Sequence, residues 1–233
     1  MPSTAVRTPD GAEMGGRLAL PASGSGPGML VLMEIFGVGP YIRRATERLA
    51  ELGYVALAPD LYRRVEPGLE LGHDREGLEQ AMAAAQRLDQ AGAVADSVTA
   101  LEALRQFPQV EGRPVGVLGF CLGGRLAYEV AVASDPALAV CYYGSGIADL
   151  LDRADQIACP ALFHFGAEDQ YIPLEAAQRV CEVASTRPDW ECHIQPDGGH
   201  AFDNHESEMF WRPAPAERAW ELTRDFLARH LTP

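Results

Sequence analysis

Two hydrophobic patterns alternate along most of this chain. Short continuous apolar runs, such as Met29–Met33, have the length and character of strands that are covered on both faces. Between these runs, apolar residues recur every three or four positions, as Ile42, Ala45 and Leu49 do, which is typical of amphipathic helices. Strands that alternate with helices predict an α/β fold, with a mostly parallel central sheet and helices on both faces.

No repeat or linker interrupts this alternation, and a chain of 233 residues with an α/β pattern is usually one domain. We therefore expect residues 1–233 to form a single domain. Strands are predicted near residues 16–20, 29–33, 54–60, 115–119, 137–143, 160–165 and 190–195, and helices near 41–52, 76–88, 94–107, 122–133, 173–184 and 215–231.

A cysteine follows one of the predicted strands directly. The apolar run Val115–Leu118 leads into the segment Gly119–Gly123, which places Cys121 between two glycines, and a helical pattern follows. This G-x-C-x-G pattern is that of a nucleophile elbow, a sharp turn between a strand and a helix. The glycines leave room for a strained backbone, and the N-terminus of the helix favours a thiolate. The alternative is an inert buried thiol beside an ordinary turn.

Ligands of parallel sheets bind beyond the carboxyl ends of the strands, so polar residues there are candidate site residues. Cys121, Asp169 and His200 follow the chain order nucleophile, acid, histidine that accompanies this type of elbow. A thiol needs a base beside it, and the imidazole needs an acceptor that fixes its tautomer. The alternative is that the acid and the histidine are solvated surface residues. The full set at these strand ends is Glu34, Asp60, Cys121, Glu168 or Asp169, and His200.

With these residues in place, the chain resembles the dienelactone hydrolase (carboxymethylenebutenolidase) family, which has the α/β-hydrolase fold. The resemblance runs from about residue 29 to residue 205. The matching motifs are Met33–Gly37, Ala58–Tyr62, Gly119–Gly124, Tyr142–Gly144, Gly166 with Asp169 and Ile172–Pro173, and Gly199–His200.

The resemblance implies a role for each member of the predicted triad. Cys121 would attack the carbonyl carbon of a lactone or ester, His200 would be the base, and Asp169 would orient the imidazole. A thioester would form and then be hydrolysed by water. The implied activity is therefore that of a carboxylic ester hydrolase with a cysteine nucleophile.

Five further residues receive expectations from the same resemblance. The backbone N–H groups of Leu122 and Ile35 would form the oxyanion hole. Glu34 would help to form the thiolate when substrate binds. A carboxylate at the end of a buried strand is costly without a partner, although Glu34 could instead simply reach solvent. Phe36 and Tyr142 would line the substrate pocket, with ordinary core packing as the alternative.

The sequence departs from the family at the residues that bind the carboxylate of the substrate. Members that cleave dienelactone hold this carboxylate with two arginines, one in the helix after the Pro59–Asp60 loop and one shortly after the catalytic histidine. Here Leu78 and Asn204 stand near those positions. Asparagine cannot replace the charge of a bidentate arginine. The candidate substitutes are Arg43, Arg64, Arg75 and Arg125, each with a solvated surface position as the alternative.

Composition excludes several other chemistries. All 19 basic residues are arginine, which removes the lysine that a P-loop or a Schiff base requires. A net charge of −14 would repel nucleic acid and anionic membranes. The five cysteines show no C-x-x-C spacing, so we expect neither a disulfide framework nor a zinc site. We expect no cofactor and no metal, a small-molecule ester or lactone as partner, and a monomer, with a dimer as the alternative.

Two further patterns concern location and the remaining histidines. The segment Met1–Arg7 has no apolar core of a signal peptide, and the apolar stretch Met29–Val38 is too short to span a bilayer. These features favour the cytoplasm. His164, inside an apolar strand, is expected in the core, whereas surface positions are expected for His73, His193, His205 and His230.

Three alternatives to this hypothesis remain open at the level of sequence. Within the enzymes, the alternative is a broad carboxylesterase or thioesterase. A non-catalytic binding protein of the same fold is also compatible with the fold, although all three triad residues are present. A thiol redox sensor built on Cys121 would lack a nearby resolving cysteine.

Overall fold

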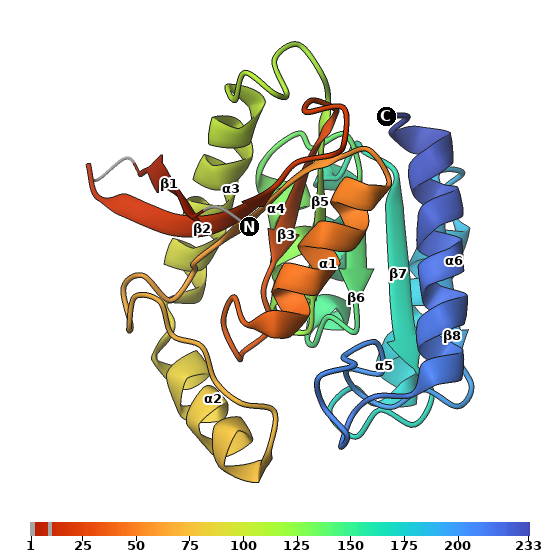
Figure 1. The fold of residues 1–233 in the computed structure, drawn as a ribbon. Coiled ribbons are helices and arrows are strands. Elements are labelled where there is room, and N and C mark those ends of the chain that lie inside the picture. Colours follow the sequence, from red (N-terminus) through yellow and green to blue (C-terminus); the bar gives the residue numbers. More distant parts are fainter. Residues whose placement is uncertain (1–2, 9–10) are drawn as a thin grey trace.

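A single sheet of eight strands forms the centre of the structure. The computed structural model describes residues 3–8 and 11–233. The strand order is β1-β2-β4-β3-β5-β6-β7-β8 (Figure 1). Strand β2 runs antiparallel to both of its neighbours, β1 and β4, and all other neighbouring strands are parallel. The strands are β1 (Ser3–Arg7), β2 (Glu13–Ala19), β3 (Gly28–Leu32), β4 (Val55–Pro59), β5 (Val115–Phe120), β6 (Ala139–Tyr142), β7 (Ala161–Gly166) and β8 (Trp190–Gln195).

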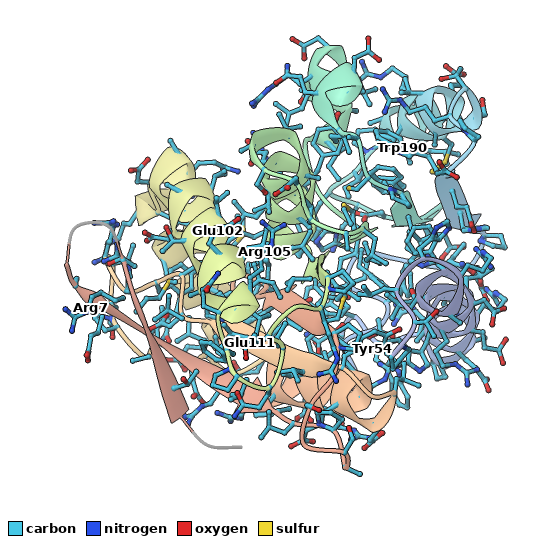
Figure 2. The ribbon with its side chains drawn as sticks, turned by 90° about the horizontal axis from the view of Figure 1, so that it is seen from above. Arg7, Tyr54, Glu102, Arg105, Glu111 and Trp190 are labelled. Carbon is cyan, nitrogen blue, oxygen red and sulfur yellow. A yellow bond between two sulfur atoms is a disulfide. The ribbon has the colours of Figure 1, made fainter. Side chains whose placement is uncertain are left out.

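Helices cover both faces of this sheet. Helices α1 and α6 lie on one face and α3, α4 and α5 on the other, as the view from above shows (Figure 2). Helix α2 instead projects from the body of the molecule (Figure 1), and only Gly77, Ala81 and Ala84 of its residues are buried. The helices are α1 (Pro40–Glu51), α2 (Arg75–Arg87), α3 (Gln90–Arg105), α4 (Leu122–Ala133), α5 (Leu174–Ser185) and α6 (Pro213–His230).

The fold class predicted from the hydrophobic pattern is confirmed. Strands β3 to β7 are buried along their whole length because helices cover both of their faces, which explains their continuous apolar sequences. The predicted face of α1 is buried as well, at Ile42, Ala45 and Leu49. Strand β1 escaped prediction because it is a short edge strand that pairs only with β2 and contains few apolar residues.

The prediction made for the cysteines differs from the structure. Cys181 on α5 and Cys192 on β8 form a disulfide with a Cα–Cα distance of 5.1 Å, so the expectation of no disulfide is wrong. The pair is invisible in the sequence because it depends on how α5 packs against β8. Cys121, Cys141 and Cys159 are free thiols. None of the helices in the described residues is both long and apolar enough to cross a membrane.

Candidate active site

Cys121 occupies a strained turn between β5 and α4. Its φ of 54° and ψ of −115° lie in a region that residues other than glycine rarely adopt. A Cβ atom added at Gly119 would lie 1.9 Å from the carbonyl oxygen of Gly123, and one added at Gly123 would lie 2.2 Å from that of Leu32. Both glycines are therefore required by close backbone contacts, as the elbow motif predicts.

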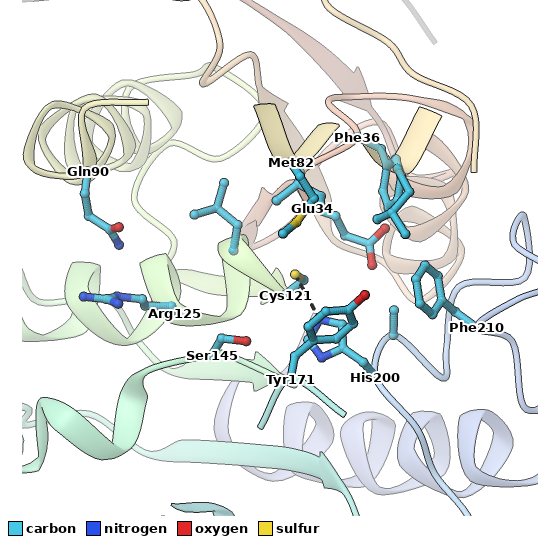
Figure 3. A pocket seen from close by; sticks show the side chains of 14 residues that line it. Glu34, Phe36, Met82, Gln90, Cys121, Arg125, Ser145, Tyr171, His200 and Phe210 are labelled. Carbon is cyan, nitrogen blue, oxygen red and sulfur yellow. Dashed lines mark hydrogen bonds between the residues drawn. The ribbon is translucent and has the colours of Figure 1, made fainter. Parts of the chain in front are cut away.

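Two hydrogen bonds join the predicted thiol, imidazole and carboxylate, and Figure 3 shows the one between Cys121 and His200. The Cys121 Sγ atom is 3.1 Å from Nε2 of His200, and His200 Nδ1 is 2.8 Å from Oδ2 of Asp169. The other oxygen of Asp169 accepts hydrogen bonds from the backbone N–H groups of Tyr171 and Ile172, at 2.8 and 3.0 Å. These donors fix the carboxylate, which in turn fixes the orientation of the imidazole.

The electrostatics of His200 favour its charged form. Burial alone would lower its pKa, but the neighbouring Cys121 and the hydrogen-bonded Asp169 carboxylate outweigh burial and raise the pKa to about 10. His200 is therefore largely protonated at neutral pH, with its Nε2 atom within hydrogen-bond distance of the Cys121 sulfur. The ring of Tyr171 lies 4.9 Å from the imidazole and edge-on to it.

Glu34 lies beside these groups in a buried position. Its side chain is 2% exposed, and its Oε2 atom accepts a hydrogen bond of 2.7 Å from Nδ2 of Asn204. Within the part of the chain that the structure describes, Oε1 has no hydrogen-bond partner. Burial raises the pKa of Glu34 to about 8, against the lowering effects of His200 and Asn204. Glu34 is therefore largely protonated at neutral pH, and solvent does not reach it.

His73 is also drawn into this region, so its predicted surface position is wrong. Its side chain is 7% exposed, its ring packs 4.3 Å from that of Phe36, and its Nε2 atom lies 4.0 Å from Oε2 of Glu34. The loop before α2 brings it there, a long-range contact that the sequence does not reveal. His164 lies in the core as predicted, and its Nε2 atom is 3.0 Å from the hydroxyl of Thr223.

Cys121, His200 and Glu34 face a cavity of about 380 Å³. Ile35 and Leu122, the two residues predicted to supply oxyanion donors, also line it. Leu122 is the first residue of α4, so its N–H group has no acceptor within the helix. The remaining lining residues are mainly apolar, with a polar group at one end: Phe36, Leu78, Met82, Tyr171, Ala201 and Phe210, and then Gln90, Arg125 and Ser145.

Three residues that the sequence suggested for the site lie elsewhere. Tyr142 is fully buried and does not line the cavity, because its hydroxyl turns toward α6, where it lies 2.7 Å from that of Thr223. The prediction that Tyr142 contacts substrate is therefore wrong, because the side chain packs in the core. Asp60 accepts hydrogen bonds from the backbone N–H groups of Tyr62 and Gly68 and so holds its own loop. Glu168, the alternative acid, is exposed, which leaves Asp169 as the partner of the imidazole.

Sequence reasoning missed several of the residues that shape the cavity. Tyr171, Met82, Phe210 and Gln90 line it, yet none belongs to a motif. The sequence marks Asn204 only as the occupant of a position where the family carries arginine, and the structure places it against Glu34. This asparagine, at a position where the family carries arginine, is the one feature of the sequence that could have pointed to the contact with Glu34. The described residues contain no group of three or more histidine, cysteine or acidic side chains placed to hold a metal ion.

The mostly parallel sheet, with an elbow after β5, an acid after β7 and a histidine after β8, defines a protein of the α/β-hydrolase class. The sequence model of the dienelactone hydrolase family matches residues 14–231. A carboxymethylenebutenolidase of Pseudomonas putida is 35% identical over 224 residues, which cover 96% of this chain and 94% of the relative.

Two more distant relatives agree with this match. A probable 2-oxo-3-(5-oxofuran-2-ylidene)propanoate lactonase of Bradyrhizobium sp. is 30% identical over 217 residues, covering 88% of this chain and 84% of the relative. The crystal structure of a putative dienelactone hydrolase from Klebsiella pneumoniae superposes with a TM-score of 0.81 at 26% identity, covering 98% of each chain. The chain belongs to the dienelactone hydrolase family and is a hydrolase.

Proposed function

We propose that this protein hydrolyses a lactone or carboxylic ester through Cys121 as nucleophile, His200 as base and Asp169 as the residue that orients the imidazole. The observation that carries the proposal is the unbroken series of contacts from Sγ of Cys121 to Oδ2 of Asp169 at the wall of an apolar cavity. The carboxymethylenebutenolidases and the probable lactonase among the relatives favour lactones within this class.

The reaction would proceed in two halves. The thiolate of Cys121 attacks the carbonyl carbon, and the N–H groups of Ile35 and Leu122 stabilise the oxyanion that forms. The intermediate then collapses to a thioester and expels the alkoxide, which takes a proton from the imidazolium of His200. Neutral His200 next removes a proton from water, the hydroxide attacks the thioester, and the acid leaves with the thiolate restored.

Glu34 would control the charge of the thiol in this scheme. Its Oε1 atom is buried and has no hydrogen-bond partner among the described residues, and the carboxyl group faces the cavity beside Cys121. When substrate enters, the carboxylate of Glu34 would accept the thiol proton, which leaves a protonated Glu34 beside a thiolate that the imidazolium of His200 stabilises. Phe36, which packs on His73 beside Glu34, would form the adjacent wall of the substrate site.

The proposal is tested with a panel of lactones and aryl esters. Cys121→Ala is expected to reduce turnover to the background rate while the circular dichroism spectrum stays unchanged. Cys159→Ser, which removes a free thiol outside the cavity, is the matched control and should retain activity. Mass spectrometry of the wild type during turnover should detect an acyl group on the peptide that contains Cys121. Full activity in Cys121→Ala would refute the proposal.

A further inference from the structure

One end of the cavity carries polar side chains that the proposed triad does not use. Gln90, Arg125 and Ser145 lie together on the side away from Phe36 and Phe210, as Figure 3 shows. Cys121 is the N-cap of α4 and Arg125 is the fourth residue of this helix, and both line the same cavity.

The guanidinium of Arg125 has donors without protein acceptors. No hydrogen bond to it occurs in the described part of the chain, and its Nε atom is buried. The nearest carboxylate is that of Glu129, whose Oε2 atom lies 3.5 Å from Nε. That oxygen already accepts a hydrogen bond of 2.9 Å from Nε2 of Gln90. Glu129 therefore balances part of the charge of Arg125 but leaves the terminal N–H groups available.

Gly146, in the loop after β6, lies against the guanidinium of Arg125. A Cβ atom at Gly146 would lie 2.7 Å from Nη1 of Arg125, so a larger residue there would displace the guanidinium from this position. Gly146 also has a φ of 82°, in the left-handed region that favours glycine. The neighbouring Ser145 lines the cavity on the same side. Arg125 and Ser145 therefore border the same end of the cavity.

The other arginines considered from the sequence are placed differently. Arg43 forms an ion pair of 2.7 Å with Glu70, and Arg64 one of 3.2 Å with Asp96. Arg75 is exposed and does not line the cavity. Of the four candidates, the cavity that contains Cys121 is lined by Arg125 alone.

We propose that Arg125, assisted by Ser145, binds an acidic group of the substrate and thereby determines specificity. Arginine pairs with carboxylates through two parallel hydrogen bonds. The substrate class is therefore an ester or lactone whose carboxylate reaches the end of the cavity that Gln90, Arg125 and Ser145 line. This inference rests on the proposed function of Cys121, and it places the acidic group on the α4 side of the cysteine, away from Leu78 and Asn204.

The test compares two aryl esters with acyl chains of equal length, one ending in a carboxylate and the other in a carboxamide. The measured quantity is the ratio of their kcat/KM values in the wild type, Arg125→Gln and Arg125→Lys. We expect Arg125→Gln to reduce the preference for the acid by about 10- to 100-fold, the range of a charged hydrogen bond. Arg125→Lys should retain part of the preference because it keeps the charge but loses the planar fork.

The matched control is Arg44→Gln, which makes the same change of charge at an exposed ion pair with Glu51 and should leave the ratio unchanged. An unchanged ratio in Arg125→Gln would overturn the inference. That result differs from failure of the proposed function, in which the wild type hydrolyses neither ester.

A binding measurement tests the inference even if the wild type hydrolyses neither ester. Glutarate should slow the alkylation of Cys121 by iodoacetamide in the wild type more than glutaramide does, and Arg125→Gln should abolish this difference. Equal protection by glutarate and glutaramide in the wild type, or a difference that Arg125→Gln leaves intact, would overturn the inference without reference to turnover.

Discussion

Replacement of Glu34 by glutamine should make the protein more stable, increasingly so as the pH rises. The buried carboxyl has a pKa of about 8, raised from an ordinary value of 4.5 mainly by burial. Between these two pH values Glu34 is protonated in the folded protein and ionised in the unfolded chain. The folded state therefore loses stability as the pH rises through this window, and the loss is complete above the folded pKa. A glutamine, which does not ionise, removes the loss.

The magnitude follows from the two pKa values. The difference between 4.5 and about 8 corresponds to about 5 kcal/mol above pH 8, at roughly 1.4 kcal/mol per pH unit. At pH 7 the expected gain in the free energy of unfolding is about 3 kcal/mol by the same relation, and near pH 4.5 it should vanish. The carbonyl oxygen of glutamine can still accept the hydrogen bond from Asn204, so little other change is expected.

Urea unfolding of wild type and Glu34→Gln between pH 4.5 and 9 measures this difference. Glu79→Gln, an exposed position on α2, is the control and should show no growing difference with pH. A constant difference between wild type and Glu34→Gln over the whole range would refute the assignment of Glu34 as a buried neutral acid. If Glu34 also ionises the thiol, the same variant should be alkylated more slowly at Cys121, so that stability rises while reactivity falls.

Three further predictions concern Asp169, Asn204 and the disulfide. Asp169→Asn should lower kcat/KM by about 10³- to 10⁴-fold because the imidazole loses the acceptor that fixes its tautomer; rates near those of the wild type would contradict this role. Asn204→Ala should lower the free energy of unfolding by about 1–3 kcal/mol, since a buried carboxyl oxygen loses its donor, whereas an unchanged value would mean that water replaces the amide. Finally, denatured protein kept free of reductant should show three reactive thiols, as Cys181 and Cys192 are paired. Reduction should then lower the free energy of unfolding by roughly 3 kcal/mol for a loop of this length, and five thiols before reduction would contradict the pairing.

Local sequence patterns were sufficient for most of the fold. Strand β8 (Trp190–Gln195) and helix α4 (Leu122–Ala133) have the predicted bounds because apolar spacing and flanking glycine or proline mark their ends. The edge strand β1 could not be predicted, since its pairing with β2 rather than burial holds it in place. Prediction thus succeeded where apolar spacing and flanking residues mark an element in the sequence, even at the edge strand β8.

The candidate site divides in the same way. The proximity of Cys121, Asp169 and His200 could be predicted because the carboxyl ends of parallel strands meet at one edge of the sheet, and their contacts agree with it. Tyr142 was misplaced because successive residues of a strand face opposite sides of the sheet, and a motif does not state which side meets the substrate. The pairing of Cys181 with Cys192 depends on packing between elements, which local patterns do not encode.

Because α2 projects from the body of the molecule, the shape of the cavity wall depends little on the packing of the sheet. This helix supplies Leu78 and Met82 to the wall of the cavity, yet it buries little of its own surface against the sheet. Substitutions at these two positions can change the shape of the cavity at little expense to the packed sheet that holds the cysteine. The fold therefore gives this protein an evolutionary freedom: the range of substrates can diverge among relatives while the reactive centre stays the same.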